Sequence, residues 1–153
     1  MKKFAVILLL LTTPLLCFGR LMKAWTYQEL FDQADLVVVA VPISTHDTKE
    51  SGGLPGWSTI ETVGVNTEFQ SSVVMKGDTK VKKFILHHYR LKNPKQIPPN
   101  APSFVGFKPP FKLETSERFL LFLKRESDGK YAPVSGQIDP ALFDVVKLNG
   151  MAR

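Results

Sequence analysis

Histidines are the side chains of this sequence best suited to chemistry. His87 and His88 are adjacent in the mostly apolar stretch 84–90, and His46 directly precedes Asp47 in a polar stretch. Adjacent residues of a strand point to opposite faces, so His87 and His88 could not hold one metal ion together. A zinc or copper site would need one of them with His46 and a carboxylate such as Asp47. We expect hydrogen-bonded strand histidines instead, with no metal and no other cofactor.

Motifs of nucleophilic catalysis and phosphate binding do not occur in the sequence. The stretch PVSGQ, residues 133–137, lacks the first glycine of G-x-S-x-G. The glycine-rich stretch 51–57 lacks the Lys-Ser/Thr ending of a phosphate-binding loop. A glycosidase could use any two carboxylates, so this class stays open. We expect a protein that is not an enzyme; the alternative is an envelope hydrolase or metal-binding protein that uses His46, His87 or His88.

The N-terminus is typical of a secretory signal peptide. Lys2 and Lys3 precede an apolar run over residues 4–16, and Cys17 and Gly19 are small enough for positions −3 and −1 of a cleavage site. The run is shorter than the ~20 residues that span a bilayer. We therefore predict a signal peptide over 1–19, a single domain over 20–153, and a periplasmic or secreted protein that is not integral to the membrane after cleavage. Cys17, the only cysteine, would leave with the signal, which excludes thiol catalysis.

The full sequence has a net charge of +6, and its basic residues concentrate in the middle of the chain. The members of this basic cluster are Lys76, Lys80, Lys82, Lys83, Arg90, Lys92, Lys95, Lys108 and Lys112. Such a cluster can attract anionic polymers or lipid surfaces, although most charge runs are solvated faces. Lys80, Lys82 and Arg90 share one parity over residues 80–90, which include the strand predicted over 81–90, and this makes them candidate binding residues. Export makes nucleic acid an unexpected partner.

The first half of the domain is expected to contain a helix and two strands. Thr26 and Glu29 have the spacing of a capping box, and a helical apolar stripe of Tyr27, Leu30, Phe31 and Ala34 accompanies them. The stretch 35–43 is a β-branched strand, and the polar, glycine-containing stretch 45–57 is a predicted loop. Residues 59–75 alternate between apolar odd and polar even positions, which predicts a long half-buried strand with a bulge near Ser71 and Ser72.

The second half is expected to contain further strands and a long loop. Six of the eleven prolines lie in 91–111, which predicts an ordered loop that packs its aromatic rings on the domain. Alternatively, Phe104 and Phe107 are exposed anchors for a protein partner. Residues 119–123 read as a central strand and Asp128-Gly129 as a hairpin turn. Residues 139–148 predict a last helix capped by Asp139, or an irregular arm.

The sequence predicts about five antiparallel strands that are apolar on both faces, so both faces of the sheet must be buried against other parts of the domain. We predict a mainly β fold, a small closed antiparallel OB-type barrel with a short N-terminal helix and a long proline-rich loop.

Three stretches carry a resemblance to a known family. ADLVVVAVP (34–42), TEFQSSVVMKGD (67–78) and RFLLFLKRESDGKYAPVSG (118–136) resemble bacterial exported domains of the netrin-like type. These domains are related to the tissue inhibitors of metalloproteinases, and the resemblance implies an OB-type barrel. Those inhibitors chelate the catalytic zinc through an N-terminal cysteine, which the predicted mature chain lacks, so that mechanism does not transfer.

Taken together, the sequence predicts an exported, non-enzymatic binding domain. Its expected partner is another envelope protein, contacted through loops, with an anionic polymer or lipid surface as the alternative. The candidate binding residues are Lys80, Lys82, Arg90, Phe104 and Phe107.

Overall fold

The computed structural model of this chain describes residues 22–54, 57–95, 97, 101–108, 111 and 117–148. The predicted signal peptide lies outside these residues, as do parts of the proline-rich stretch and the last five residues of the chain. Within the described ranges, no helix is long and apolar enough to cross a membrane.

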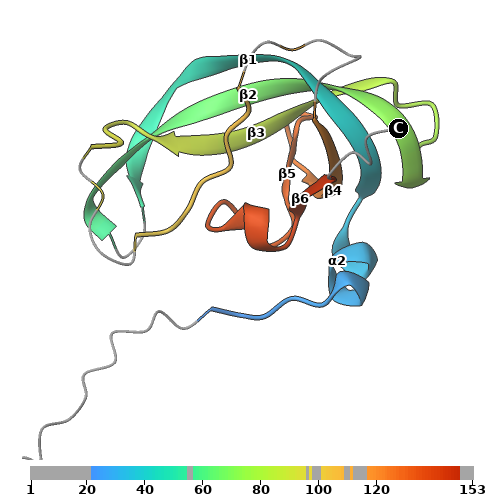
Figure 1. The fold of residues 1–153 in the computed structure, drawn as a ribbon, viewed down its shortest axis with the longest axis horizontal. Helices are drawn as coiled ribbons and strands as arrows, with labels where there is room; N and C mark the ends of the chain where they lie inside the picture. Colours follow the sequence, from blue (N-terminus) through green and yellow to red (C-terminus); the bar gives the residue numbers. More distant parts are fainter. Residues whose placement is uncertain are drawn as a thin grey trace, which may run out of the picture.

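Among the described residues, strands dominate the architecture and one short α-helix lies beside them (Figure 1). In chain order the elements are α2 (Tyr27–Gln33), β1 (Leu36–Leu54), β2 (Trp57–Lys76), β3 (Lys83–Leu91), β4 (Arg118–Arg125), β5 (Tyr131–Pro133), the 3-10 helix η1 (Pro140–Leu142) and β6 (Val145–Leu148).

Five of these strands form a ring. Hydrogen bonding follows the order β1-β2-β3-β5-β4, and β4 returns to β1 between Leu36↔Leu123 and Ala40↔Phe119. The step from β3 to β5 is a single parallel pair, Leu86↔Tyr131, and β6 pairs with β4. The prediction of a mainly β fold is confirmed, whereas the expectation that all strands pair antiparallel is wrong at the β3–β5 step.

β1 and β2 form one hairpin that is longer than the sequence predicted. The stretch 45–57 is expected as a loop, but residues 45–54 continue β1 and β2 begins at residue 57. His46 pairs with Asn66, and Gly53 pairs with Glu61. The polar side chains of this stretch are mostly exposed at this end of the hairpin. Polar composition here reflects exposure to water rather than the absence of a strand.

A bulge determines which residues of β2 face the core. The register between β1 and β2 skips Ser72, as predicted for this position. The extra residue reverses the alternation, so Phe69 is buried while Val73 and Met75 are 57% and 56% exposed. The expectation that Val73 and Met75 continue the buried row is therefore wrong, and Val74 packs against the core instead.

Both ends of α2 are held by side chains. The Thr26 hydroxyl accepts from the Glu29 amide, and the Glu29 carboxylate accepts from the Thr26 amide, so the predicted capping box is confirmed. At the other end the Lys76 ammonium donates to the carbonyls of Phe31 and Asp32, at 2.6 and 3.0 Å. This contact ties the last turn of the helix to the end of β2.

The buried face of α2 covers one side of the ring. Leu30 and Ala34 pack with Val37 and Phe122 in a small apolar cluster. Burying a leucine completely contributes about 1.5–3 kcal/mol, so this contact anchors a helix too short to be stable alone. Tyr27, expected on the same face, is 62% exposed and only stacks on Phe122.

Aromatic rings fill the interior of the ring. Phe69 stacks on Phe84 with centroids 5.5 Å apart and meets Phe107 and Phe119 edge-on. Phe107 comes from residues 101–108, which the structure describes without helix or strand. This segment therefore inserts an aromatic side chain between the strands.

The C-terminal part differs from both forms predicted over 139–148, a helix and an irregular arm. Only residues 140–142 form a 3-10 turn, and β6 follows it. Asp139 has φ 54° and does not cap the helix through its side chain. It accepts instead from the amide and hydroxyl of Ser103, which fixes the turn to the segment 101–108.

The predicted turn between the late strands is present. β4 and β5 pair antiparallel across residues 126–130, and Gly129 takes a φ of +88°, which glycine adopts without strain.

Candidate ligand pocket

His87 and His88 project to opposite sides of β3. His88 is 2% exposed and meets Phe107 edge-on inside the ring, with ring centroids 5.3 Å apart. His87 lies on the outer side, between the carboxylates of Glu50 and Glu126. The two histidines therefore belong to separate environments.

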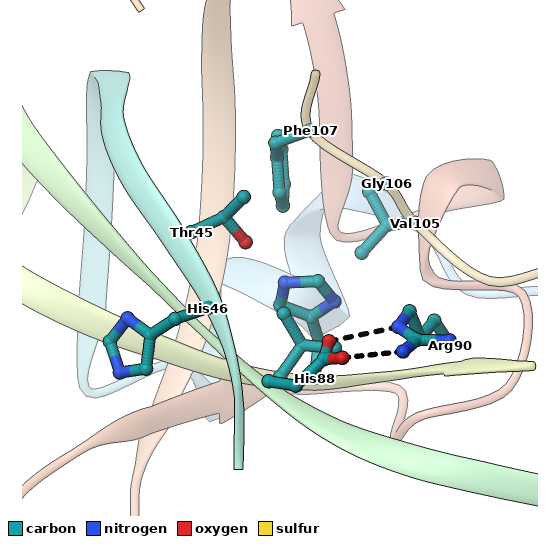
Figure 2. A pocket seen from close by; sticks show the side chains of 9 residues that line it. Thr45, His46, His88, Arg90, Val105, Gly106 and Phe107 are labelled. Carbon is teal, nitrogen blue, oxygen red and sulfur yellow. Dashed lines mark hydrogen bonds and ion pairs between the residues drawn. The ribbon is translucent and has the colours of Figure 1, made fainter. Parts of the chain in front are cut away.

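A pocket of about 380 Å³ lies beside His88, where the first three strands meet the segment 101–108 (Figure 2). The polar residues that line it are Thr45, His46, Asp47, His88 and Arg90. The remaining lining residues are Val65, Val105, Gly106 and Phe107.

His88 forms the buried base of this pocket. Its Nε2 lies 2.8 Å from the Thr67 hydroxyl, which lies 2.9 Å from the Thr45 hydroxyl. Nδ1 is buried and makes no hydrogen bond of good geometry among the described residues, although the carbonyls of Tyr89 and Val105 lie near the ring. Burial lowers the pKa of His88 to about 4, although the nearby carbonyls of Tyr89 and Val105 oppose the shift. The imidazole is therefore neutral at physiological pH.

An ion pair closes the rim of the pocket. Arg90 Nε donates to Asp47 Oδ1 at 2.9 Å, Nη2 donates to Oδ2, and Nη1 donates to the carbonyl of Leu91. These bonds hold the pKa of Asp47 below its usual range. The formal charges of Arg90 and Asp47 cancel, so the lining offers no unpaired charge.

The residues proposed above for a metal site do not converge. The His46 ring points away from His88, on the other side of β1 (Figure 2), and Asp47 is occupied by Arg90. In the part of the chain that the structure describes, no group of three or more His, Cys, Asp or Glu side chains is placed to hold a metal ion.

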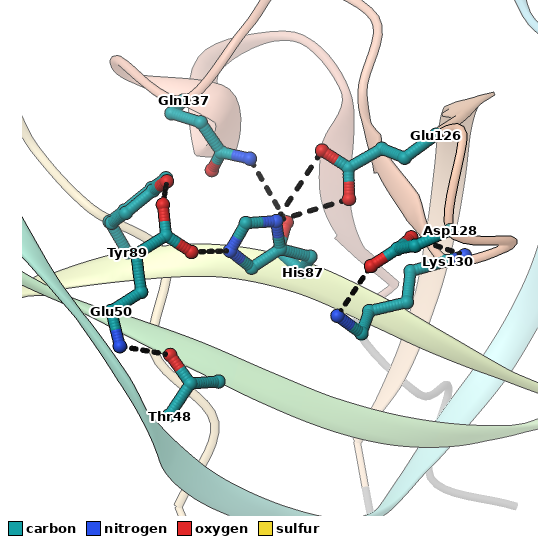
Figure 3. Close-up of polar contacts among 8 residues, drawn as sticks. All are labelled: Thr48, Glu50, His87, Tyr89, Glu126, Asp128, Lys130 and Gln137. Carbon is teal, nitrogen blue, oxygen red and sulfur yellow. Dashed lines mark hydrogen bonds and ion pairs between the residues drawn. The ribbon is translucent and has the colours of Figure 1, made fainter.

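A second polar cluster surrounds His87 on the outside of the ring (Figure 3). His87 Nδ1 lies 3.0 Å from Glu126, and Nε2 lies 3.1 Å from Glu50. A carboxylate therefore lies beside each ring nitrogen. The Tyr89 hydroxyl donates to Glu50, and burial together with this carboxylate raises the pKa of Tyr89 to about 12.

A bulge in β1 makes this cluster possible. Asp47 pairs with Val65 and Ser51 with Val63, so three residues of β1, 48–50, arch over Gly64. A Cβ at Gly64 would lie 2.6 Å from the Thr48 hydroxyl and 3.1 Å from Cβ of Glu50. Only glycine leaves room for the arch that carries Glu50 to His87.

The predicted binding residues do not form one surface. Lys80 and Lys82 are exposed and precede β3, Arg90 lies at the pocket, and Phe104 is half-buried. Phe107 is 7% exposed, so its ring belongs to the core and is not an exposed anchor. Residues 84, 86 and 88 lie in the same row as Lys80, Lys82 and Arg90, and all three are buried. The row is therefore not a continuous binding face.

Several members of the basic cluster already have partners within the chain. Lys76 binds carbonyls of α2, and Lys83, Arg90 and Lys92 pair with Glu68, Asp47 and Glu61. Lys112 lies outside the described residues. The cluster is thus partly neutralised and is spread over several elements.

Sequence reasoning missed the Thr45–Thr67–His88 chain and the wall formed by residues 105–107. Thr67 lies in the odd, inward row of 59–75, so a buried hydroxyl near an inward histidine could have been inferred. The contribution of Val105 and Gly106 depends on the path of a segment without periodicity, and no local signal reveals it.

Comparisons with protein-family models, with curated proteins and with solved structures found no match to this chain.

Proposed function

We propose that this chain is an exported, non-enzymatic binding domain that engages another envelope protein through the pocket beside His88. The observation that carries the proposal is the base of the pocket: a histidine that is 2% exposed and whose Nδ1 makes no well-formed hydrogen bond. A buried polar atom without a partner costs about 1–3 kcal/mol. Of the side-chain atoms of this kind among the described residues, only His88 Nδ1 belongs to a residue that lines the pocket. A bound group that hydrogen-bonds to Nδ1 would remove this cost.

We further propose that the ring is an OB-type barrel related to the netrin-like domains. The strand order β1-β2-β3-β5-β4, with its parallel β3–β5 step, supports this assignment. OB-type barrels bind ligands across their second and third strands and adjoining loops. The pocket, lined by β1, β2, β3 and the segment 101–108, lies in a comparable place.

Binding is favoured over catalysis by the chemistry of the pocket. A histidine with a pKa of about 4 is a poor general base at neutral pH, and the hydroxyl nearest to it belongs to Thr67, which is fully buried. Export is supported by the apolar run over residues 4–16 behind Lys2 and Lys3.

Capture from an envelope extract tests the proposal, with two tryptophan variants as a matched pair. A Cβ at Gly106, which lines the pocket, and one at Gly52, which does not, would each meet no atom within 4 Å. Gly106→Trp is expected to obstruct the pocket, whereas Gly52→Trp places the same side chain on the exposed end of the hairpin.

We expect the purified chain, expressed from the full 153-residue sequence, to retain a specific protein through a high-salt wash. Gly52→Trp should retain the same protein and Gly106→Trp should lose it. A protein retained equally by both variants would place the interaction elsewhere, and retention of anionic polymer alone at low salt would favour the basic cluster.

A further inference from the structure

We infer that the pocket accepts an uncharged group, compact and mostly apolar, with a single hydrogen-bonding function such as an amide, carbonyl or hydroxyl. This inference rests on the proposed role of the pocket as a binding site and adds the chemistry of what enters it.

The rim argues against a charged ligand. Arg90 uses Nε, Nη1 and Nη2 on Asp47 and on the carbonyl of Leu91. An incoming carboxylate would have to displace Asp47, and an incoming ammonium would have to displace Arg90. A bound carboxylate would leave Asp47 unpaired, and a bound ammonium would leave Arg90 unpaired. The free energy lost in this way offsets that gained from the new contact.

The interior argues for a mostly apolar ligand. Val65, Val105 and Phe107 line the pocket and are buried or nearly so, at 5–7% exposure. His88 is neutral, so the base of the pocket offers no charge to a ligand. A volume of about 380 Å³ is at the lower end of small-molecule sites and suits one ring or one side chain of a partner.

The hydroxyl chain determines what the ligand can bond to. The Thr67 hydroxyl, itself bonded to that of Thr45, holds Nε2 of His88. Nδ1 is buried and has no well-formed hydrogen bond, although the carbonyls of Tyr89 and Val105 lie near the ring, so it is the ring nitrogen left for a ligand. Either hydroxyl can donate or accept, so the chain tolerates both tautomers of the ring. Nδ1 can therefore donate to a carbonyl or accept from a hydroxyl or amide, with one hydrogen bond in each case.

Four monosubstituted benzenes of similar size test the inference on the full-length protein. Benzamide and benzyl alcohol are uncharged, benzoate is an anion, and benzylammonium is a cation. Binding is followed at pH 7.4 through the imidazole nitrogen signals of the three histidines in ¹⁵N-histidine-labelled protein. We expect the uncharged probes to shift the His88 signals saturably and to bind about tenfold more tightly than either ion.

Three variants sharpen the result. Gly106→Trp should abolish the His88 shifts, while Gly52→Trp should leave them unchanged. Asp47→Asn frees Arg90 from its carboxylate, and it should raise benzoate affinity about tenfold with little change for benzamide.

Tighter binding of benzoate or benzylammonium than of benzamide by the unmodified protein would overturn the inference, as would no His88 shift with any probe. These outcomes are separate from those of the capture experiment. A partner lost on Gly106→Trp together with a preference for benzoate would keep the proposed function and reject an uncharged ligand. If the uncharged probes bind but no partner is captured, the inference of an uncharged ligand is kept and the proposed protein partner is rejected.

Discussion

Two buried titratable side chains, His88 and Asp144, respond to burial in opposite ways. His88 is 2% exposed and Asp144 is fully buried. Loss of hydration disfavours the charged form of each, which lowers the pKa of His88 to about 4 and raises that of Asp144 to about 6. Hydrogen bonds from the amide and hydroxyl of Ser135 limit the second shift. Both side chains therefore make stability depend on pH, with opposite signs.

His88 should make the protein less stable in acid. Its folded pKa is below the ordinary value of 6.5, so its contribution is present above pH 6.5 and is lost as pH falls toward 4. The loss is at most on the order of 3 kcal/mol of unfolding free energy. Urea unfolding between pH 4 and 7 should show a weaker acid decline for His88→Gln than for the unmodified protein. Parallel curves for the two proteins would contradict this assignment.

Asp144 should have the reverse effect. Its folded pKa is above the ordinary 3.8, so its contribution is complete below pH 3.8 and is lost as pH rises through about 6. Asp144→Asn carries no such titration, so its unfolding free energy relative to the unmodified protein should rise between pH 4 and 7. The expected change is on the order of 2–3 kcal/mol. A difference that stays constant with pH would mean that Asp144 does not titrate in this window.

At the scale of single elements, the β1–β2 hairpin is shaped by its irregularities. One bulge at Ser72 turns Val73 and Met75 outward, and the arch over 48–50 brings Glu50 to His87. The arch depends on Gly64, whose backbone approaches β1 too closely for a side chain. With regular strand pairing, Val73 and Met75 would face the core and Glu50 would not reach His87.

Gly64→Ala should destabilise the hairpin and separate Glu50 from His87. The new methyl group would meet Thr48 at 2.6 Å, so the arch must move; we expect a loss of about 1–3 kcal/mol of unfolding free energy. Gly52→Ala, where the methyl group meets no atom within 4 Å, is the control and should be nearly neutral. Thermal or urea unfolding measures both, and equal stabilities would show that the arch adapts without strain.

The sequence predicted those elements whose formation depends on residues close together in the chain. The capping box of Thr26 and Glu29, the strand over 119–123 and the bulge near Ser72 follow from short-range spacing and were found. The extension of the hairpin through 45–54 and the strand β6 depend on a partner strand being available, which spacing does not reveal. The pocket was missed for the same reason, because residues 105–107 reach it through tertiary packing.

At the scale of the whole molecule, the ring relies on a segment outside its strands. β3 and β5 share one ladder pair, so this seam has little backbone hydrogen bonding. Phe107 supplies a ring to the interior, in contact with Phe69, Phe119 and His88. Across the seam itself, Phe84 of β3 meets Tyr131 of β5 edge-on, with ring centroids 5.8 Å apart, so side-chain packing supplements the single ladder pair.

Phe107→Ala should therefore affect the entire domain. Removing a buried phenylalanine costs about 3–5 kcal/mol, and we expect a single cooperative transition displaced by that amount. Phe104→Ala, at a half-buried position three residues earlier, should cost less. Comparable losses from the two variants would show that Phe107 has no special role in the interior.

The closing pair of the ring also sets the order in which the chain can fold. The β1–β2 hairpin joins neighbours in sequence, whereas Leu36 must wait for Leu123 before its strand gains a second partner. Contacts between distant residues form late because loop closure must precede them. Until residues 119–123 have emerged from the ribosome, the apolar row 36–41 has an open edge. A chain that stops short of residue 119 therefore exposes an unpaired apolar strand, the kind of edge that promotes aggregation.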